Sequence, residues 1–326
     1  MKALQVQALS PDLSGCAIAD VPEPERKPGE VLVRVRAASL NFPDLLMTRG
    51  EYQLKPPLPF VPGMDVAGEV IEADADSGLA PGERVMAGAR LGGMAEVAVL
   101  AADGVRPIPD GVSFEAAAAF GAAYRTAWVA LVELGQLQPG QWVLVHGASG
   151  GVGLAAVDLA KALGARVIAT SGSAHKLAAI AEAYRPDATL VAAGRFREAV
   201  AEVTGGALCD LVFDPVGGEV FDESTRCVAF GGKLLVVGFA GGRIAEIATN
   251  IPLIKGFSIV GVRAGEFARR FPVRGKAADA ALHRMLAEGR LTPRIDRVLP
   301  LSRWREGFAA MAVRELVGKV VFTPGA

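Results

Sequence analysis

Cysteine and histidine are scarce in this chain of 326 residues, which contains three of each. Cys16, Cys209 and Cys227 are far apart, odd in number and without CxxC spacing. A closed structural zinc site needs four clustered ligands, and a disulfide framework needs cysteines in pairs. The sequence therefore predicts buried free thiols, no metal site and a reducing, cytoplasmic compartment.

An excess of charge of one sign is also absent, as is a long uninterrupted apolar run. The formal net charge of -1 argues against the basic face that nucleic acid or an anionic membrane would require. The longest uncharged stretch, between Glu133 and Asp158, is interrupted by Pro139 and six glycines, whereas a membrane-spanning helix needs about 20 consecutive apolar residues. Residues 1–6 show no signal-peptide pattern. We expect a small-molecule substrate, with no nucleic-acid or membrane partner.

Glycine, in contrast, is abundant at 39 residues, and hydrophobic residues make up 51% of the chain. This length favours two domains over one. The first 109 residues contain short β-like runs separated by Pro and Gly, which predicts an all-β region. After Ser113 an alanine-rich helical stretch is followed by alternating β-like and helical segments, the pattern of a parallel sheet.

The alternating region supplies six strands, enough for a doubly wound Rossmann sheet built from two mononucleotide-binding halves. A tail of helical and β-like segments follows, and we expect it to fold back onto the first domain. The β-like runs of the first region are 30–36, 66–72, 83–87 and 94–100; the later strands are 142–147, 166–170, 189–192, 210–215, 233–239 and 258–263; the later helices are 114–134, 152–163, 175–183, 196–203 and 220–230; the tail contains 277–288, 297–299, a helix after Ser302, and 319–323.

A glycine-rich turn joins the strand at 142–147 to the helix that follows it. Gly150 lets the backbone approach a pyrophosphate, Gly153 lets helix and strand pack closely, and the helix N-terminus offers free amides. The alternative is an ordinary turn of an α/β domain. We interpret the turn as a dinucleotide site formed by Ala148, Gly150, Gly151, Val152 and Gly153, with Ala148 at the position of the first glycine.

The end of the next strand carries no acidic residue where an NAD-binding protein would place one for the ribose. Ser171, Ser173 and Lys176 stand there instead, and these side chains can donate hydrogen bonds to a 2′-phosphate. This favours NADPH over NADH. Alternatively, Ser173 is only the N-cap of a helix, a role that leaves Lys176 available to the phosphate.

Several motifs occur together in one order along the chain: Asn41-Phe42-Pro43-Asp44, Arg49-Gly50-Glu51-Tyr52, PFVPGMDVAG at 59–68, the turn at 148–153, Asp214-Pro215-Val216-Gly217-Gly218 and Val236-Val237-Gly238-Phe239. With these motifs the chain resembles the zinc-free, zeta-crystallin-like NADPH:quinone oxidoreductases of the medium-chain dehydrogenase/reductase superfamily, over nearly its full length. The resemblance implies a GroES-like β-barrel domain at 1–122 and 265–326 and a Rossmann domain at 123–264. It also implies a homodimer joined along the last Rossmann strand, 258–263.

Zinc-dependent members of this superfamily hold catalytic zinc through a Cys near the Asn41 region and a His in a Gly-His-Glu segment. Here the segment reads Gly63-Met64-Asp65, and no cysteine lies near Asn41. A methionine thioether is a poor zinc ligand, so the resemblance implies a zinc-free enzyme.

The resemblance also implies roles for individual residues. The substrate side would be formed by Asn41, Tyr52 and Tyr124, and the cofactor side by Asn41, Thr126, Asp214, Val216, Gly238, Phe239 and Arg263, beside the turn, Ser171 and Lys176. Structural alternatives stay open: capping for Asn41 and Asp44, positioning for Tyr52, because a phenol is a weak acid, and a surface ion pair for Arg263. His146 is interpreted as a packed, hydrogen-bonded histidine.

Two departures from the family pattern bear on specificity. Relatives carry a tyrosine near the 2′-phosphate after the third Rossmann strand, whereas this chain has Val191-Ala192-Ala193-Gly194-Arg195; Arg195 is a hypothetical substitute. Arg125 stands where relatives have glycine, and we expect it to narrow or charge the substrate entrance.

The leading hypothesis is hydride transfer from NADPH to a quinone or similar activated acceptor, with the cofactor supplying the chemistry. An NADPH-dependent enone or enoyl-thioester reductase is the alternative enzyme. A basic groove for a phosphopantetheine arm would favour it; the sequence shows no clear groove, although Arg263, Arg269 and Arg270 cluster near the end of the sheet. A hypothesis of another class is an NADPH-binding structural or redox-sensing protein with little turnover.

Overall fold

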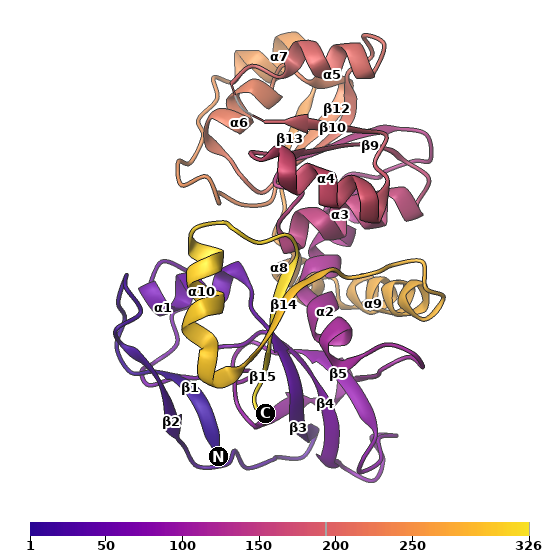
Figure 1. Ribbon diagram of the computed structural model, residues 1–326. Helices are drawn as coiled ribbons and strands as arrows, with labels where there is room; N and C mark the ends of the chain where they lie inside the picture. The colour runs from indigo at the N-terminus through magenta and orange to yellow at the C-terminus, as the bar shows by residue number, and fades with distance from the viewer. Residues whose placement is uncertain (193, 326) are drawn as a thin grey trace. The chain divides into compact units, whose positions relative to one another are not determined.

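The computed structural model describes residues 1–192 and 194–325. These form two compact units, Met1–Ala122 with Pro293–Ala326, and Ala123–Thr292 (Figure 1). The second boundary differs from the prediction, which placed it at 264–265. The reason is that the helices after the last Rossmann strand are bonded to the second unit, as described below.

The first unit is built on a mostly antiparallel sheet of seven strands, in the order β14-β15-β3-β4-β5-β7, with β6 paired to β3. A separate antiparallel pair, β1-β2, completes it. The predicted strands of this region are confirmed, but the helix α1 was not predicted. The elements of this unit are β1 (Lys2–Val6), β2 (Cys16–Asp20), β3 (Glu30–Ser39), α1 (Phe42–Arg49), β4 (Asp65–Glu72), β5 (Arg84–Gly88), β6 (Val97–Ala101), β7 (Arg106–Pro107), β14 (Ile295–Pro300), α10 (Trp304–Ala312) and β15 (Lys319–Thr323), with short 3-10 turns at Ala102–Gly104 and Leu301–Arg303.

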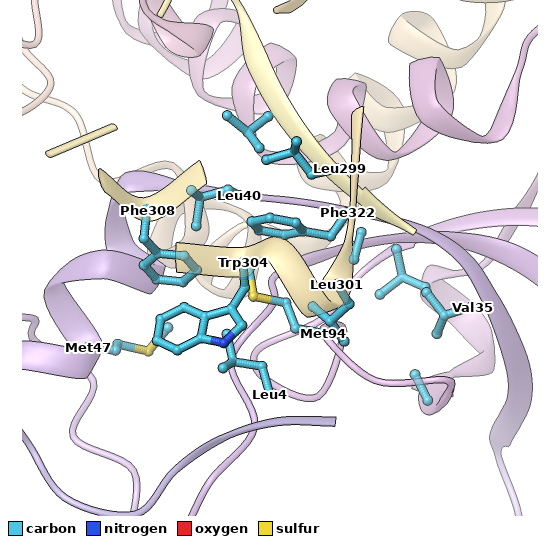
Figure 2. Close-up of a cluster of buried hydrophobic side chains, with 14 of the residues drawn as sticks. Leu4, Val35, Leu40, Met47, Met94, Leu299, Leu301, Trp304, Phe308 and Phe322 are labelled. Carbon is cyan, nitrogen blue, oxygen red and sulfur yellow. The ribbon is translucent and has the colours of Figure 1, made fainter. Parts of the chain in front are cut away.

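The C-terminal tail supplies much of the core of the first unit, as predicted. Figure 2 shows Trp304, Phe308 and Phe322 packed together among side chains from β1, β3 and α1. Trp304 meets Phe308 edge-on at 5.6 Å between ring centroids, and Phe308 stacks on Phe322 at 6.2 Å. Removing a buried aromatic ring of this kind costs about 3–5 kcal/mol. The tail is therefore an integral part of this unit.

The second unit contains a six-stranded parallel sheet in the order β10-β9-β8-β11-β12-β13. Numbered from its first strand, this is the order 3-2-1-4-5-6 of a Rossmann fold, and all six predicted strands are confirmed. The strands are β8 (Trp142–Val145), β9 (Arg166–Ser171), β10 (Ala188–Val191), β11 (Cys209–Asp214), β12 (Val228–Val236) and β13 (Ser258–Gly261); the helices are α2 (Phe114–Trp128), which crosses from the first unit, a π-helical continuation (Val129–Leu134), α3 (Gly151–Ala162), α4 (Ala174–Tyr184), α5 (Arg197–Val203), α6 (Gly218–Ser224), α7 (Asn250–Lys255), α8 (Ala264–Arg270) and α9 (Pro272–Ala287).

One predicted helix, 220–230, is too long, because α6 ends at Ser224 and residues from Val228 belong to β12. The amide of Cys227 still bonds back to the Ser224 carbonyl, but the carbonyl of Cys227 accepts the amide of Cys209. Pairing with β11 therefore overrides the helical pattern at this point.

Ion pairs attach α8 and α9 to the second unit. Arg125 on α2 binds Asp279 on α9 through two hydrogen bonds of 2.8 and 3.1 Å. Arg274 binds Glu133 at the π-helical turn and lies over the rings of Phe267 and Phe271. These contacts explain the later domain boundary. Asp279 also compensates the charge of Arg125, which argues against the charging of the substrate entrance and leaves the narrowing a prediction.

His146 follows β8 in the centre of the sheet and is completely buried. Its Nε2 lies 2.7 Å from the Ser224 hydroxyl, and its Nδ1 lies 2.8 Å from the Thr170 hydroxyl. Because Ser224 donates its own proton to the Val220 carbonyl, Nε2 donates to Ser224 and Nδ1 accepts from Thr170. Burial lowers the pKa of His146 to about 3, so the ring is neutral and structural, as interpreted from the sequence.

We predict that His146 makes stability depend on pH. The unfolded chain protonates this ring below about pH 6.5, while the folded protein keeps it neutral down to about pH 3. The wild-type free energy of unfolding should therefore fall, relative to that of His146→Gln, by about 1.4 kcal/mol per pH unit below 6.5. Urea unfolding at several pH values measures this. His175→Gln, at an exposed position, is the control. If the free energies of unfolding of wild type and His146→Gln differed by the same amount at every pH, the prediction would be wrong.

Candidate functional site

The glycine-rich turn lies at the carboxyl end of β8. Gly147 has a positive φ of 56°, and the amide of Ala148 bonds to the Thr170 carbonyl at the end of β9. Gly150 is the N-cap of α3, and a Cβ added there would meet nothing closer than 3.5 Å. The first amides of a helix have no intrahelical acceptor and carry the positive end of its dipole. The start of α3 is therefore suited to a phosphate group.

Gly153 sets how closely α3 approaches this turn. A Cβ at this position would lie 2.2 Å from the Gly147 carbonyl oxygen and 2.9 Å from the Ala148 Cα. Both atoms belong to the backbone, so they cannot move aside as a side chain can. This is the close packing of helix and strand that the third glycine of a dinucleotide fingerprint serves.

The ends of β11 and β12 meet beside the turn. The carbonyl of Asp214 accepts the amides of Val237 and Gly238, and the carbonyl of Val216 accepts that of Gly241. A Cβ on Gly147 would lie 3.3 Å from both Pro215 and Val216. The structure thus brings the turn together with predicted residues of the cofactor side, namely Asp214, Val216, Gly238 and Phe239. β8 and β11 are neighbouring strands, and the chain continues from β8 to β9 on one side of the pair and from β11 to β12 on the other. This reversal of strand order is the switch point at which such sheets bind ligands.

Asp214 carries an unsatisfied oxygen at this edge. Its Oδ1 accepts the amides of Val216 at 2.8 Å and Gly217 at 3.0 Å, while Oδ2 is buried and has no partner among the described residues. Burial raises the pKa of this carboxyl. A buried acceptor without a donor is costly, and a hydroxyl or amide donor on a bound dinucleotide would satisfy it. The residues present therefore fit such a cofactor.

The predicted 2′-phosphate residues lie at the end of β9 and the start of α4. Ser171 is buried, with its hydroxyl 3.5 Å from that of Ser149, so it faces the turn. Ser173 is the N-cap of α4, although its side chain makes no capping bond within the described part of the chain. Lys176 is half-buried in the first turn.

Arg195 lies in a hollow of mixed charge. It lines this hollow of about 290 Å³ with Gly194, Arg226 and three acidic residues of α6, Glu219, Asp222 and Glu223. Two of these carboxylates are in ion pairs, Asp222 with Arg243 and Glu223 with Arg226. Ala193, in the segment that lacks the family tyrosine, lies outside the described residues.

Tyr124 donates its hydroxyl proton to Asp158 Oδ2 at 2.5 Å, and the same oxygen accepts the amide of Thr292 at 2.7 Å. Burial raises the pKa of Tyr124 well above its ordinary value. This tyrosine is therefore a poor proton donor, whatever else it contacts. Thr126 is half-buried on α2.

Arg263 is exposed at the N-cap of α8. Its neighbours Arg269 and Arg270 both bind Glu266. The basic cluster considered as a phosphate contact is thus partly neutralised.

The first unit contains a buried polar cluster around Asn41, the N-cap of α1. Asp44 accepts the amides of Asn41 at 2.8 Å and Gly63 at 2.9 Å, which is the capping role left open above; burial raises its pKa to about 7. The Asn41 side chain donates to Asp65 at 2.9 Å and accepts from Lys319 Nζ at 2.5 Å. Sequence reasoning missed Lys319, because nothing in its local sequence indicates burial.

Tyr52 lies after α1, partly buried against the core of the first unit. Within the residues that the structure describes, no three His, Cys, Asp or Glu side chains gather in a way that could hold a metal ion. Nor is any described helix both long and apolar enough to cross a membrane.

Comparison with known proteins agrees with this architecture. Residues 27–110 match the alcohol dehydrogenase GroES-like domain, and residues 151–277 match the zinc-binding dehydrogenase family. The chain is 37% identical over 300 residues to quinone oxidoreductase-like protein 2 of Bos taurus, covering 91% of this chain and 86% of that protein. It belongs to the quinone oxidoreductase family of the medium-chain dehydrogenases/reductases.

Other members extend the comparison. The quinone oxidoreductase of Thermus thermophilus, solved also as its complex with NADPH, superposes with a TM-score of 0.86 at 32% identity, covering 99% of this chain and 100% of that one. A segment of the polyketide synthase GfsB of Streptomyces halstedii is 37% identical over 310 residues, 90% of this chain and 5% of that protein. The resemblance inferred from the motifs is confirmed, as is the GroES-like plus Rossmann fold.

For this oxidoreductase we predict that Gly153→Ala both destabilises the protein and weakens dinucleotide binding. The added methyl group must push α3 from the turn, at a cost of about 1–3 kcal/mol. Thermal unfolding and the dissociation constant for NADPH measure the two effects. Gly265→Ala on α8, where an added Cβ meets nothing within 4 Å, is the matched control; equal behaviour of the two variants would refute the packing role of Gly153.

Proposed function

We propose that this oxidoreductase transfers hydride from NADPH to a quinone without zinc. The observation that carries the proposal is the edge formed by the ends of β8, β11 and β12, which contains the first amides of α3 and the buried Asp214 Oδ2, an oxygen with no partner among the described residues. The names of the relatives support the quinone, and the NADPH complex of the Thermus enzyme supports the cofactor. Asn41, Met64 and Asp65 are a poor donor set for zinc, with the Lys319 ammonium beside two of them.

Bound NADPH supplies the hydride, and the protein binds, orients and shields the reactants. The amides of Gly151, Val152 and Gly153 hold the pyrophosphate, and Asp214 Oδ2 accepts a hydrogen bond from the dinucleotide. Lys176 donates to the 2′-phosphate. We assign contacts with the remainder of the cofactor to Val216, Gly238, Phe239, Thr126 and Arg263. We assign contacts with the acceptor to Asn41 and Tyr52.

A second acceptor class is supported by the similarity to a segment of a polyketide synthase. In this alternative the hydride reduces the activated C=C bond of an enone or enoyl thioester at the same site. The pairing of Arg269 and Arg270 with Glu266 leaves less positive charge for a phosphopantetheine arm, which favours the quinone.

Turnover of a panel of acceptors distinguishes these proposals. Loss of NADPH absorbance should be fast with quinones and slower with enones and crotonyl thioesters, and absent with aldehydes, which need stronger polarisation. Alcohol oxidation that depends on added zinc would overturn the zinc-free assignment. Turnover of no acceptor despite NADPH binding would favour a structural or redox-sensing protein.

The preference for NADPH is tested through Lys176. Lys176→Ala should raise the KM for NADPH about tenfold, the loss of one charge-assisted hydrogen bond, and leave the KM for NADH unchanged. Arg195→Ala is the comparison variant, and because carboxylates already lie beside this guanidinium, we expect a smaller change in the KM for NADPH than Lys176→Ala gives. Equal effects of Lys176→Ala on NADPH and NADH would exclude Lys176 as the phosphate contact.

We propose a homodimer along β13, the terminal strand of the Rossmann sheet. Apolar side chains of the same region are exposed, including Phe230 at 89%, Leu253 at 80% and Ile254 at 74%, and Phe230 lies against Gly256, just before β13. A second copy would cover them and pair the strand edge.

Light scattering after size-exclusion chromatography measures the mass of the assembly. Ile254→Lys should shift the protein towards monomer, because the interface would bury the added charge. Val313→Lys, at another exposed apolar position, in the first unit, should leave the mass unchanged. A monomeric wild-type protein at micromolar concentration would refute the dimer.

We assign the protein to the cytoplasm. Cys16, Cys209 and Cys227 are free, buried thiols, as a reducing compartment favours. Burial raises the pKa of Cys16 to about 11 and that of Cys227 to about 12, and raises that of Cys209 further.

A further inference from the structure

The polar cluster of the first unit contains a buried charge to which the proposed reaction assigns no role. Lys319 is the first residue of β15 and only 6% exposed. Its position is tightly set: Gly318 has a φ of 115°, and a Cβ there would lie 2.5 Å from the Arg294 carbonyl oxygen. Burial lowers the pKa of this lysine, while Asp65 and Asp44 oppose the shift. A buried ammonium is costly unless it is paired and hydrogen-bonded, so its partners determine what the charge can do.

The Lys319 ammonium contacts two side chains, Asn41 and Asp65. Its Nζ donates to Asn41 Oδ1 at 2.5 Å and lies 3.9 Å from Asp65 Oδ2. Asn41 Nδ2 donates to that same Asp65 oxygen at 2.9 Å. A rotated carboxamide would turn its NH₂ group towards the ammonium and its oxygen towards the carboxylate. The ammonium and the carboxylate together therefore allow one orientation of Asn41.

The second Nδ2 proton of Asn41 is held less firmly. Its acceptor is the Ser39 carbonyl at 3.4 Å, beyond the usual range for an N–H···O bond. A positive charge at Oδ1 withdraws electron density from the amide and makes Nδ2 a stronger donor. A ligand oxygen can therefore accept a hydrogen bond from this N–H more readily than from the N–H that is bonded to Asp65.

We propose that Lys319 is a positioning residue for hydride transfer, whose ammonium fixes and polarises the Asn41 carboxamide so that Nδ2 donates a hydrogen bond to an oxygen of the bound acceptor. The inference rests on the proposed function, in which Asn41 contacts the acceptor. As the nicotinamide C–H bond breaks and its electron pair forms the new bond to the acceptor, negative charge develops on the acceptor oxygen. A preoriented donor stabilises that charge, and solvent supplies the proton afterwards.

A double-mutant cycle tests this role. Lys319→Met keeps the length of the side chain and removes the charge; it should lower kcat with a quinone by about tenfold to a hundredfold and leave the KM for NADPH unchanged. Asn41→Ala should have a similar effect, and the double variant should be no slower than Asn41→Ala alone. Multiplying effects, or an unchanged kcat in Lys319→Met, would overturn the proposal.

Two further variants separate positioning from stability. Lys319→Gln keeps a donor for Asn41 Oδ1 without the charge, so its kcat should lie between those of wild type and Lys319→Met. Lys2→Met, which removes an exposed lysine paired with Asp20, should retain wild-type kcat. A kcat that merely follows the melting temperature across these variants would indicate a structural role.

A spectroscopic readout requires no turnover. The chain has two asparagines, Asn41 and Asn250, and Asn250 is exposed. With ¹⁵N-labelled asparagine, the wild-type Asn41 side-chain protons should exchange with water much more slowly than those of Asn250, and Lys319→Met should shift and accelerate them. Equal exchange of both asparagines in the wild type would overturn the proposal. Slow Asn41 exchange that Lys319→Met accelerates, together with turnover of no acceptor, would overturn the proposed function and leave only the restraint of Asn41 by Lys319.

Discussion

The close approach of Gly153 to the Gly147 carbonyl oxygen is the constraint on which the nucleotide-binding edge depends. It brings the first turn of α3 against the end of β8 and so determines where the unpaired amides of that helix lie. The neighbouring ends of β9 and β11 are then joined to the same turn, through the Ala148 amide and through the contact of Gly147 with Pro215 and Val216. A side chain at position 153 would separate these parts even though none of their own residues had changed.

Asp65 has a comparable role in the first unit. Its Oδ1 accepts the amide of Ala122, and its Oδ2 accepts hydrogen bonds from Asn41 and Ser39. A Cβ on Gly121 would lie 2.4 Å from Oδ1, so α2 reaches this carboxylate only because it carries glycine there. Asp214 differs from Asp65 in this respect: both oxygens of Asp65 have partners, whereas Asp214 Oδ2 has none among the described residues. His146 resembles Asp65 in this respect, because both of its ring nitrogens have hydrogen-bond partners within the protein.

The sequence predicted the parts of the fold and the site that arise from neighbouring residues. The strand, turn and helix around Gly150 are local, and so are the six apolar strands that specify the parallel sheet. The contacts that were missed join distant residues. Lys319 and Asn41 are 278 positions apart in the sequence. Tyr124 on α2 bonds to Asp158 on α3, and Arg125 on α2 bonds to Asp279 on α9. The residues next to a lysine before an apolar strand, or next to an aspartate within a helix, do not indicate which distant residue it will contact. For the same reason the second boundary between the compact units differs from the predicted one.

The burial of the three thiols has a chemical consequence for an enzyme of this kind. Quinones and enones are electrophiles that add to thiolates, and the thiolate rather than the thiol is the reactive form. With every cysteine buried and its pKa raised, the protein offers its own acceptors almost no thiolate. Acceptors of either proposed class would therefore be reduced without alkylating the protein that reduces them.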